Sequence, residues 1–146
     1  MSRIEVVLLD PKFKFLEKES RLFARKALLY FRKPKARLEI YLAGPALMRS
    51  LNRKFRGKNK AADVLSFGFS PKFVYPPDRF NPIGEIYLNA IYVKKKDPGS
   101  KQMLLLKLLT HGILHLLGYT HKSSRDRIKM EAREKQFIKW LTSSQV

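Results

Sequence analysis

The sequence predicts an α+β fold in which a four-stranded, mostly parallel sheet with one antiparallel edge strand packs with about five helices around a buried central helix. Two observations lead to this class. The first half of the chain alternates short β-branched runs with longer helical patterns, and the second half contains one segment that is apolar nearly all the way round. A length of 146 residues suits a single domain spanning residues 1–146.

The first half of the chain predicts a strand–helix–strand unit followed by a second helix. Ile4–Leu9 is short, apolar and β-branched, which is typical of a strand. Apolar residues recur near helical spacing over Phe13–Phe31, and Arg37–Ala43 alternates like a strand. A helix over about Gly44–Phe55 follows, opened by a Gly-Pro pair. This order of elements predicts that the two strands pair in parallel.

Two further strands flank a proline-rich segment. Asp63–Phe69 predicts the third strand and Gly84–Leu88 predicts the fourth. Between them, Ser70–Pro82 contains four prolines, which indicates a loop. Because only a loop joins them, we expect these two strands to pair antiparallel at an edge of the sheet.

The C-terminal part of the chain predicts helices. Ala90–Lys96 predicts a helical turn, and Asp97–Gly99 breaks the chain before the central helix. Arg125–Leu141 predicts a final amphipathic helix. We expect its inward-facing residues to be Ile128, Ala132, Phe137 and Leu141.

The central helix lies within Gln102–His121, with the sequence QMLLLKLLTHGILHLLGYTH. One lysine, one threonine and two histidines interrupt the otherwise apolar run Met103–Leu117. A surface helix would show a narrower apolar stripe, so the rest of the domain should wrap around this one. Gly118 is expected to end the helix, because glycine adopts the left-handed conformation at little steric cost.

The three histidines of the chain all fall in this stretch, at His111, His115 and His121. The first two are four residues apart on one helix face, with Cβ atoms roughly 5–6 Å apart, which lets both imidazoles reach one metal ion. After the glycine turn, the third can return to the same ion. Three nitrogen ligands leave a fourth position for water, which is typical of catalytic zinc. Histidines that are only packed or solvated have no reason to gather at ligand spacing.

The spacing His-x-x-x-His-x-x-Gly-x-x-His is that of the metzincin peptidases, with one change. Gly112 stands where those enzymes carry the catalytic glutamate. A metallopeptidase is therefore one interpretation of the spacing, and the missing glutamate counts against it.

Charge predicts a polyanionic partner. Thirty-one Lys and Arg against twelve Asp and Glu give a formal net charge of +19. Ion-pair networks of the thermophile kind would raise the acidic residues too, and these are few. Nucleic acid is therefore the expected partner, ahead of an anionic membrane. The chain has no cysteine, which excludes disulfides and thiolate zinc sites, and we expect neither a signal peptide nor a membrane span.

Three stretches occur in the order and at the spacing of a known family: LNRKFRGKNKAADVLSF at Leu51–Phe67, GEIYL at Gly84–Leu88 and HGILHLLGYTH at His111–His121. Together they resemble the YbeY family, bacterial metal-dependent endoribonucleases of ribosomal RNA maturation. Thr120 stands where that family usually has Asp, and Ala61–Ala62 where it usually has Thr, commonly after Pro. The first departure leaves open whether a carboxylate helps to orient the third histidine.

The resemblance implies a zinc-dependent, single-strand-directed endoribonuclease that acts in ribosomal RNA processing and ribosome quality control. One zinc ion per chain, or a similar divalent metal, would be held by His111, His115 and His121. The implied partners are ribosomal RNA together with ribosomal subunits or ribosomal proteins, and no membrane is expected. We expect a monomer in the cytoplasm.

Arg56 occupies the position that the family motif fills with arginine, just before the third strand. A guanidinium offers a planar fork that holds a phosphate and stabilises charge that develops on it. The resemblance assigns Arg56 to catalysis together with His111. The alternative is a solvated arginine in a basic loop.

Three other polar residues lie on the predicted third and fourth strands. Asp63 and Glu85 are carboxylates at strand starts, where they can orient a ligand histidine or a water molecule. For Glu85 we expect an ordinary strand-edge charge. Ser66 can present its hydroxyl to phosphate, but no sequence feature pairs it with a base, so we do not expect a nucleophile.

Six lysines are candidates for contacts with the RNA backbone: Lys54, Lys58, Lys60, Lys94, Lys95 and Lys96. Such runs are often only a solvated face. Four aromatic residues flank the proline-rich loop, where they can stack on unpaired bases or, as the simpler expectation, anchor the loop and core. These are Phe67, Phe69, Phe73 and Tyr75.

Three functions follow from these observations, in order of preference. The first is a metal-dependent endoribonuclease, in which either an activated water or the RNA's own 2′-OH attacks the phosphate. The second is a metallopeptidase, which leaves the basic charge unexplained. The third is a ribosome-binding protein whose metal only holds a loop, which leaves the open three-nitrogen site unexplained.

Overall fold

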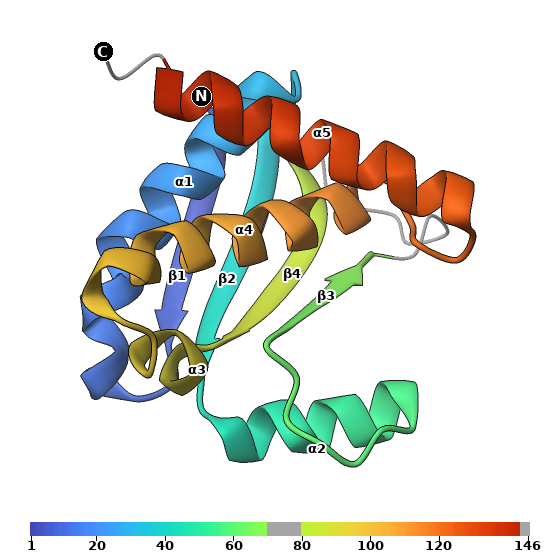
Figure 1. Ribbon diagram of the computed structural model, residues 1–146. Helices are drawn as coiled ribbons and strands as arrows, with labels where there is room; N and C mark the ends of the chain where they lie inside the picture. The colour runs from blue at the N-terminus through green and yellow to red at the C-terminus, as the bar shows by residue number, and fades with distance from the viewer. Residues whose placement is uncertain (70–79, 144–146) are drawn as a thin grey trace.

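The computed structural model describes residues 1–69 and 80–143, and it confirms the α+β class (Figure 1). Within these residues, four strands form one mixed sheet that packs with five α-helices and one 3-10 helix in a single domain. No helix in this part of the chain is both long and apolar enough to cross a membrane.

The sheet has the strand order β1-β2-β4-β3. β1 (Arg3–Leu8) pairs in parallel with β2 (Ala36–Ala43), which pairs in parallel with β4 (Asn81–Asn89). β3 (Val64–Gly68) pairs antiparallel with β4 at the edge. The predicted parallel unit and the predicted antiparallel edge strand are both confirmed.

The fourth strand begins earlier than predicted, at Asn81 rather than at Gly84. The Asn81 N–H donates to the Lys35 carbonyl at 2.8 Å, which starts the pairing before the proline is reached. Pro82 is tolerated because the register between β2 and β4 shifts beside it, and prolines in sheets occur at such irregularities. The predicted loop therefore ends before Asn81, and its residues 70–79 lie outside the described part of the chain.

Three helices cover one face of the sheet (Figure 1). They are α1 (Glu17–Tyr30), α4 (Pro98–Leu116) and α5 (Ser124–Ser143), and α4 crosses in front of the strands between the other two. α2 (Pro45–Arg56) lies beyond the end of the sheet where β2 terminates. The short α3 (Ala90–Lys94) follows β4 directly.

Two predicted helix starts are wrong, and both lie at prolines. The segment Phe13–Phe31 begins as a 3-10 helix, Pro11–Leu16, before α1 starts at Glu17. The central helix includes Pro98 in its first turn instead of starting after it. Proline is favoured at the start of a helix because the backbone there has no N–H bond to lose.

The buried core lies between the sheet and α4. Leu38 and Ile40 of β2 are fully buried, as are Leu109 and Ile113 of α4. Alternate strand residues point the same way, so β2 offers one continuous apolar stripe to the helices. The prediction of a buried central helix is confirmed, with Lys107 on its exposed side.

The inward face of α5 is rotated from the predicted one. Ile128 is 63% exposed and Ala132 is exposed too, whereas Met130 is buried. Phe137 and Leu141 are buried as predicted. The three buried residues are seven and four positions apart and so share one helix face, which packing against α1 and α4 selects.

The other face of the sheet carries carboxylates and tyrosines. Glu5, Glu39 and Glu85 are register partners across β1, β2 and β4. The rings of Tyr41 and Tyr87 stack with centroids 4.6 Å apart. The Tyr41 hydroxyl donates to Glu39 at 2.8 Å, and the Tyr87 hydroxyl donates to Glu85 at 3.2 Å. We call these five residues the carboxylate–tyrosine face.

Candidate metal centre

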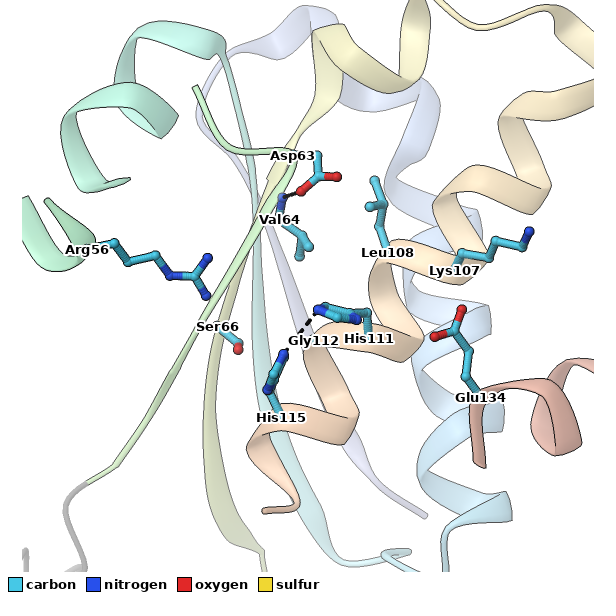
Figure 2. A pocket seen from close by; sticks show the side chains of 10 residues that line it. All are labelled: Arg56, Asp63, Val64, Ser66, Lys107, Leu108, His111, Gly112, His115 and Glu134. Atoms are coloured by element: carbon cyan, nitrogen blue, oxygen red, sulfur yellow. Dashed lines mark hydrogen bonds between the residues drawn. The ribbon is translucent and has the colours of Figure 1, made fainter. Parts of the chain in front are cut away.

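The three histidines converge at the C-terminal end of α4. Their ligand nitrogens all lie within 4.8 Å of one another. His111 and His115 are one helical turn apart, and their Nε2 atoms are 3.0 Å apart (Figure 2). His121 joins them after the helix ends, with its ring centroid 4.8 Å from that of His115. The structure therefore brings together the three residues that the spacing predicted.

A glycine turn returns the chain to the cluster. Gly118 has a φ of +101°, a backbone conformation that glycine adopts easily. The N–H of Gly118 donates to the His115 carbonyl at 3.1 Å, and that of Tyr119 donates to the Leu114 carbonyl at 3.0 Å. His115 Nδ1 lies 3.0 Å from the Tyr119 carbonyl oxygen, so the ring can donate there and leave Nε2 free for an ion.

Burial keeps two of these histidines in the form that binds a metal. It is the largest cause that lowers the pKa of His111 to about 4, and charge on His115 and His121 acts in the same direction. The pKa of His115 is also lowered, chiefly by burial. Both imidazoles are therefore neutral at pH 7, as metal ligands must be. Such converging imidazole nitrogens fit zinc or a similar divalent ion.

His111 and His115 line a cavity of about 230 Å³ between α4, β3 and α5. Among the residues predicted from the sequence, Arg56, Asp63 and Ser66 line it together with two of the histidines (Figure 2). Lys107 and Glu134 line it too, and sequence reasoning missed both. Lys107 lies four residues before His111 on one helix face, a signal that the sequence contains. Nothing in the sequence points to Glu134.

Arg56 is directed at this cavity by the end of α2. The helix stops at Gly57, whose φ is +70°, and the Gly57 N–H donates to the Arg53 carbonyl at 3.1 Å. The turn beyond is held by Asn52, a buried residue whose Nδ2 donates to the Lys60 carbonyl at 2.9 Å. Figure 2 shows the Arg56 guanidinium pointing into the pocket from the side opposite the histidines.

Gly112 explains why this site has no glutamate after its first histidine. A Cβ added at Gly112 would lie 3.0 Å from Cδ1 of Ile86. A side chain there would crowd the side chain of Ile86 on β4. Glu85, beside Ile86 on β4, points to the other side and belongs to the carboxylate–tyrosine face, as expected for an ordinary strand charge.

The six candidate lysines form two exposed groups. Lys54, Lys58 and Lys60 lie at the end of α2 and in the turn beyond it, next to Arg56. Lys94–Lys96 lie at the end of α3, ahead of the start of α4. At 1.5 Å per helical residue, α4 separates this second group from the histidines by roughly 20 Å.

The aromatic residues near β3 act mainly as anchors. Phe67 packs edge-on against Phe55 with ring centroids 5.1 Å apart, which ties β3 to α2. Phe69 is partly exposed, and Phe73 and Tyr75 lie outside the described residues.

Thr120, which stands at the family's usual Asp position, reaches a carboxylate instead of supplying one. Its hydroxyl donates to Asp126 Oδ2 at 3.2 Å. A carboxylate from the start of α5 therefore lies next to the residue that precedes His121.

A model of the family described as Endoribonuclease YbeY matches residues 11–142. The chain belongs to the YbeY family. The resemblance inferred from three short motifs is thus confirmed, and so is the enzyme class that it implied, a metal-dependent endoribonuclease.

Several YbeY proteins match this chain over most of its length. One from Pelagibacter ubique, named Endoribonuclease YbeY, is 32% identical and the match covers 97% of each chain. A protein of the same name from Buchnera aphidicola is 31% identical, covering 92% of this chain and 89% of its own. The solution structure of a Thermotoga maritima protein superposes with a TM-score of 0.58 at 24% identity, covering 98% of this chain and 93% of that one, which supports the fold.

Proposed function

We propose that this YbeY-family chain is a zinc-dependent endoribonuclease that cuts single-stranded RNA in ribosomal RNA maturation and ribosome quality control. The observation that carries the proposal is the convergence of three histidine nitrogens, two of them lining a cavity that Arg56 enters from the other side. The enzyme is a cytoplasmic monomer with one hydrolase domain over residues 1–146. It acts on ribosomal RNA, and its partners are ribosomal subunits or ribosomal proteins. Family membership and a net charge of +19 support these assignments.

Each part of the pocket has a role in this reaction. His111, His115 and His121 hold one zinc ion, which supplies polarisation of the scissile phosphate and a lowered pKa for water. Arg56 presents its planar fork of donors to the phosphate and stabilises the negative charge that develops during cleavage. The exposed lysines beside Arg56 hold the RNA backbone by charge.

The attacking oxygen does not come from a side chain. Ser66 lines the pocket, but no hydrogen bond joins it to a histidine or a carboxylate among the described residues. Without a base, a serine hydroxyl is a weak nucleophile. Water and the RNA's own 2′-OH are the two remaining nucleophiles.

Peptide hydrolysis fits this site less well. Metzincin-type chemistry needs a carboxylate beside the first histidine, and a side chain at Gly112 would meet Ile86 instead. The net charge of +19 would also have no role in a peptidase.

Removal and return of the metal test the proposal. We expect roughly one zinc ion per chain, loss of most RNA cleavage on chelation and recovery when zinc is added back. His115→Ala should lose both zinc and cleavage because it removes a ligand. Tyr87→Phe, on the carboxylate–tyrosine face, is the matched control and should keep both.

The substrate class is tested in the same assay with a single-stranded RNA, a fully paired RNA and a peptide. We expect the single-stranded RNA to be cut fastest and the peptide not to be cut. Full cleavage by the metal-free protein or by His115→Ala would contradict the proposal, as would a preference for the peptide.

A further inference from the structure

His111 has one ring nitrogen that faces the other ligands and one that faces away. Its Nε2 lies 3.0 Å from Nε2 of His115, so its Nδ1 is on the far side of the ring. Metal-binding histidines almost always donate the second N–H to a carboxylate, a carbonyl or water, which fixes the tautomer and the ring orientation. His115 has such an acceptor in the Tyr119 carbonyl. Among the described residues, none makes a hydrogen bond to His111 Nδ1.

Two carboxylates line the cavity and are candidates for this acceptor, Asp63 and Glu134. Asp63 lies at the start of β3, and its Oδ1 already accepts the Val64 N–H at 2.7 Å. Its charge acts on His111, because it opposes the lowering of that residue's pKa. Figure 2 shows Glu134 rising from α5 with its carboxylate directed toward α4, below Lys107, and both residues line the same cavity as His111.

Glu134 is half-buried, and no hydrogen bond or ion pair joins it to another described residue. Burial is the main cause that raises the pKa of its carboxyl, and Lys107 acts in the opposite direction. A carboxylate withdrawn from water without a donor costs free energy, which a nearby N–H would offset.

We propose that Glu134 is a positioning residue, whose carboxylate accepts a hydrogen bond from Nδ1–H of His111 and so holds Nε2 toward the metal. The two groups come from α5 and α4 and share one cavity wall. This hydrogen bond selects the tautomer with a free Nε2 and makes that nitrogen a better ligand. The inference rests on the proposed metal site but not on RNA cleavage.

Zinc affinity, measured by competition with a chromogenic chelator, tests this role. Loss of such an outer partner typically weakens metal binding about 10–100-fold, and we expect this for Glu134→Ala. Glu134→Gln keeps an acceptor oxygen without the charge and should recover part of the loss. Glu131→Gln, an exposed glutamate on the same helix, is the matched control and should bind zinc as the wild type does.

A nuclear magnetic resonance measurement on zinc-loaded protein with 15N-labelled histidine supplies a readout that general destabilisation would not mimic. The Nδ1–H of His111 should exchange slowly with water in the wild type and fast in Glu134→Ala. Unchanged zinc affinity in Glu134→Ala would overturn the proposal, as would an equal loss in Glu131→Gln. If the alanine variant does not fold, the test rests on Glu134→Gln. A Glu134→Gln variant with wild-type zinc affinity and an unshifted resonance for the Nδ1–H of His111 would overturn the role of the carboxylate.

The failure of this inference is distinguishable from failure of the proposed function. If His115→Ala still binds zinc as the wild type does, the metal site itself is wrong. If His115→Ala loses zinc and Glu134→Ala does not, only the role of Glu134 is wrong.

Discussion

The metal pocket and the carboxylate–tyrosine face lie on opposite sides of the same sheet, and both gather polar side chains. On the face, the polar groups satisfy one another: Tyr41 donates to Glu39 at 2.8 Å and Tyr87 donates to Glu85 at 3.2 Å. In the pocket, the ligand nitrogens of the three histidines lie within 4.8 Å of one another, close enough to share one ion.

This difference separates a site from a polar surface. Polar groups that pair with each other stabilise the fold and leave little to offer a ligand. Ligand-type groups that converge beside a cavity, with pKa values shifted by burial, indicate chemistry. The pocket meets the second description: burial lowers the pKa of His111, and a guanidinium enters from the other side.

The largest expected effect concerns Arg56. Arg56→Ala should lower single-turnover RNA cleavage about a hundredfold to a thousandfold, because a donor aimed at developing charge is lost. RNA affinity should change far less, since many other lysine and arginine side chains hold the RNA backbone. Arg56→Lys keeps the charge without the fork and should recover part of the rate.

Tyr87→Phe provides the comparison on the opposite face and should cleave at the wild-type rate. Wild-type cleavage by Arg56→Ala would make the arginine a solvated loop residue. Equal losses of binding and rate would mean that Arg56 only positions the RNA.

The second prediction tests the close approach of α4 to the sheet beneath the histidines. Gly112→Ala should destabilise the fold by about 1–3 kcal/mol, because the added methyl group would crowd Ile86 at 3.0 Å. Gly99→Ala in the same helix meets no atom within 4 Å and should leave stability unchanged or slightly raise it. Urea denaturation of both variants measures this difference. If Gly112→Ala and Gly99→Ala were equally stable, α4 would be able to move away from Ile86 at no cost in free energy.

The third prediction concerns the two lysine groups. RNA affinity should fall linearly with salt on a log–log plot, and neutralising Lys94, Lys95 and Lys96 together should flatten the slope by about 2 for single-stranded RNA. The same change at Lys54, Lys58 and Lys60 is the comparison beside the pocket. If the slope changes only when Lys54, Lys58 and Lys60 are neutralised, the RNA binds on the pocket side. Lys94–Lys96 would then be excluded as contacts with the RNA backbone.

The smallest predicted effect is on the pH dependence of stability. In metal-free protein, stability should decrease as pH falls from about 6.5 toward 4, because the unfolded chain protonates His111 before the folded chain does. On the carboxylate–tyrosine face the hydrogen bond to Glu39 raises the pKa of Tyr41, so stability should decrease above pH 10, where only the unfolded tyrosine ionises. Thermal melting across pH measures both limbs. Tyr41→Phe should weaken the loss of stability at alkaline pH and leave the loss at acid pH unchanged. If the loss at acid pH also disappeared in this variant, the two effects could not be assigned to separate sides of the sheet.

Local rules determined the metal cluster from the sequence. His111 and His115 fall on one helix face because the helix has a fixed period, and Gly118 turns the chain back because glycine adopts a positive φ. Both rules act within a few residues, so the spacing predicted the convergence that the structure contains. The parallel strands and the antiparallel edge were predictable for the same reason, since short connections restrict how neighbouring strands pair.

Tertiary packing alone decided which distant side chains share the pocket. Glu134 lines the same cavity as His111 only because α5 docks beside α4 with Met130 inward, and the sequence pattern favoured a face that includes Ile128 instead. The row of Glu5, Glu39 and Glu85 likewise exists only once three strands pair in register. Such contacts join elements far apart in the chain, and their geometry depends on how whole apolar faces fit together rather than on the spacing within any one segment.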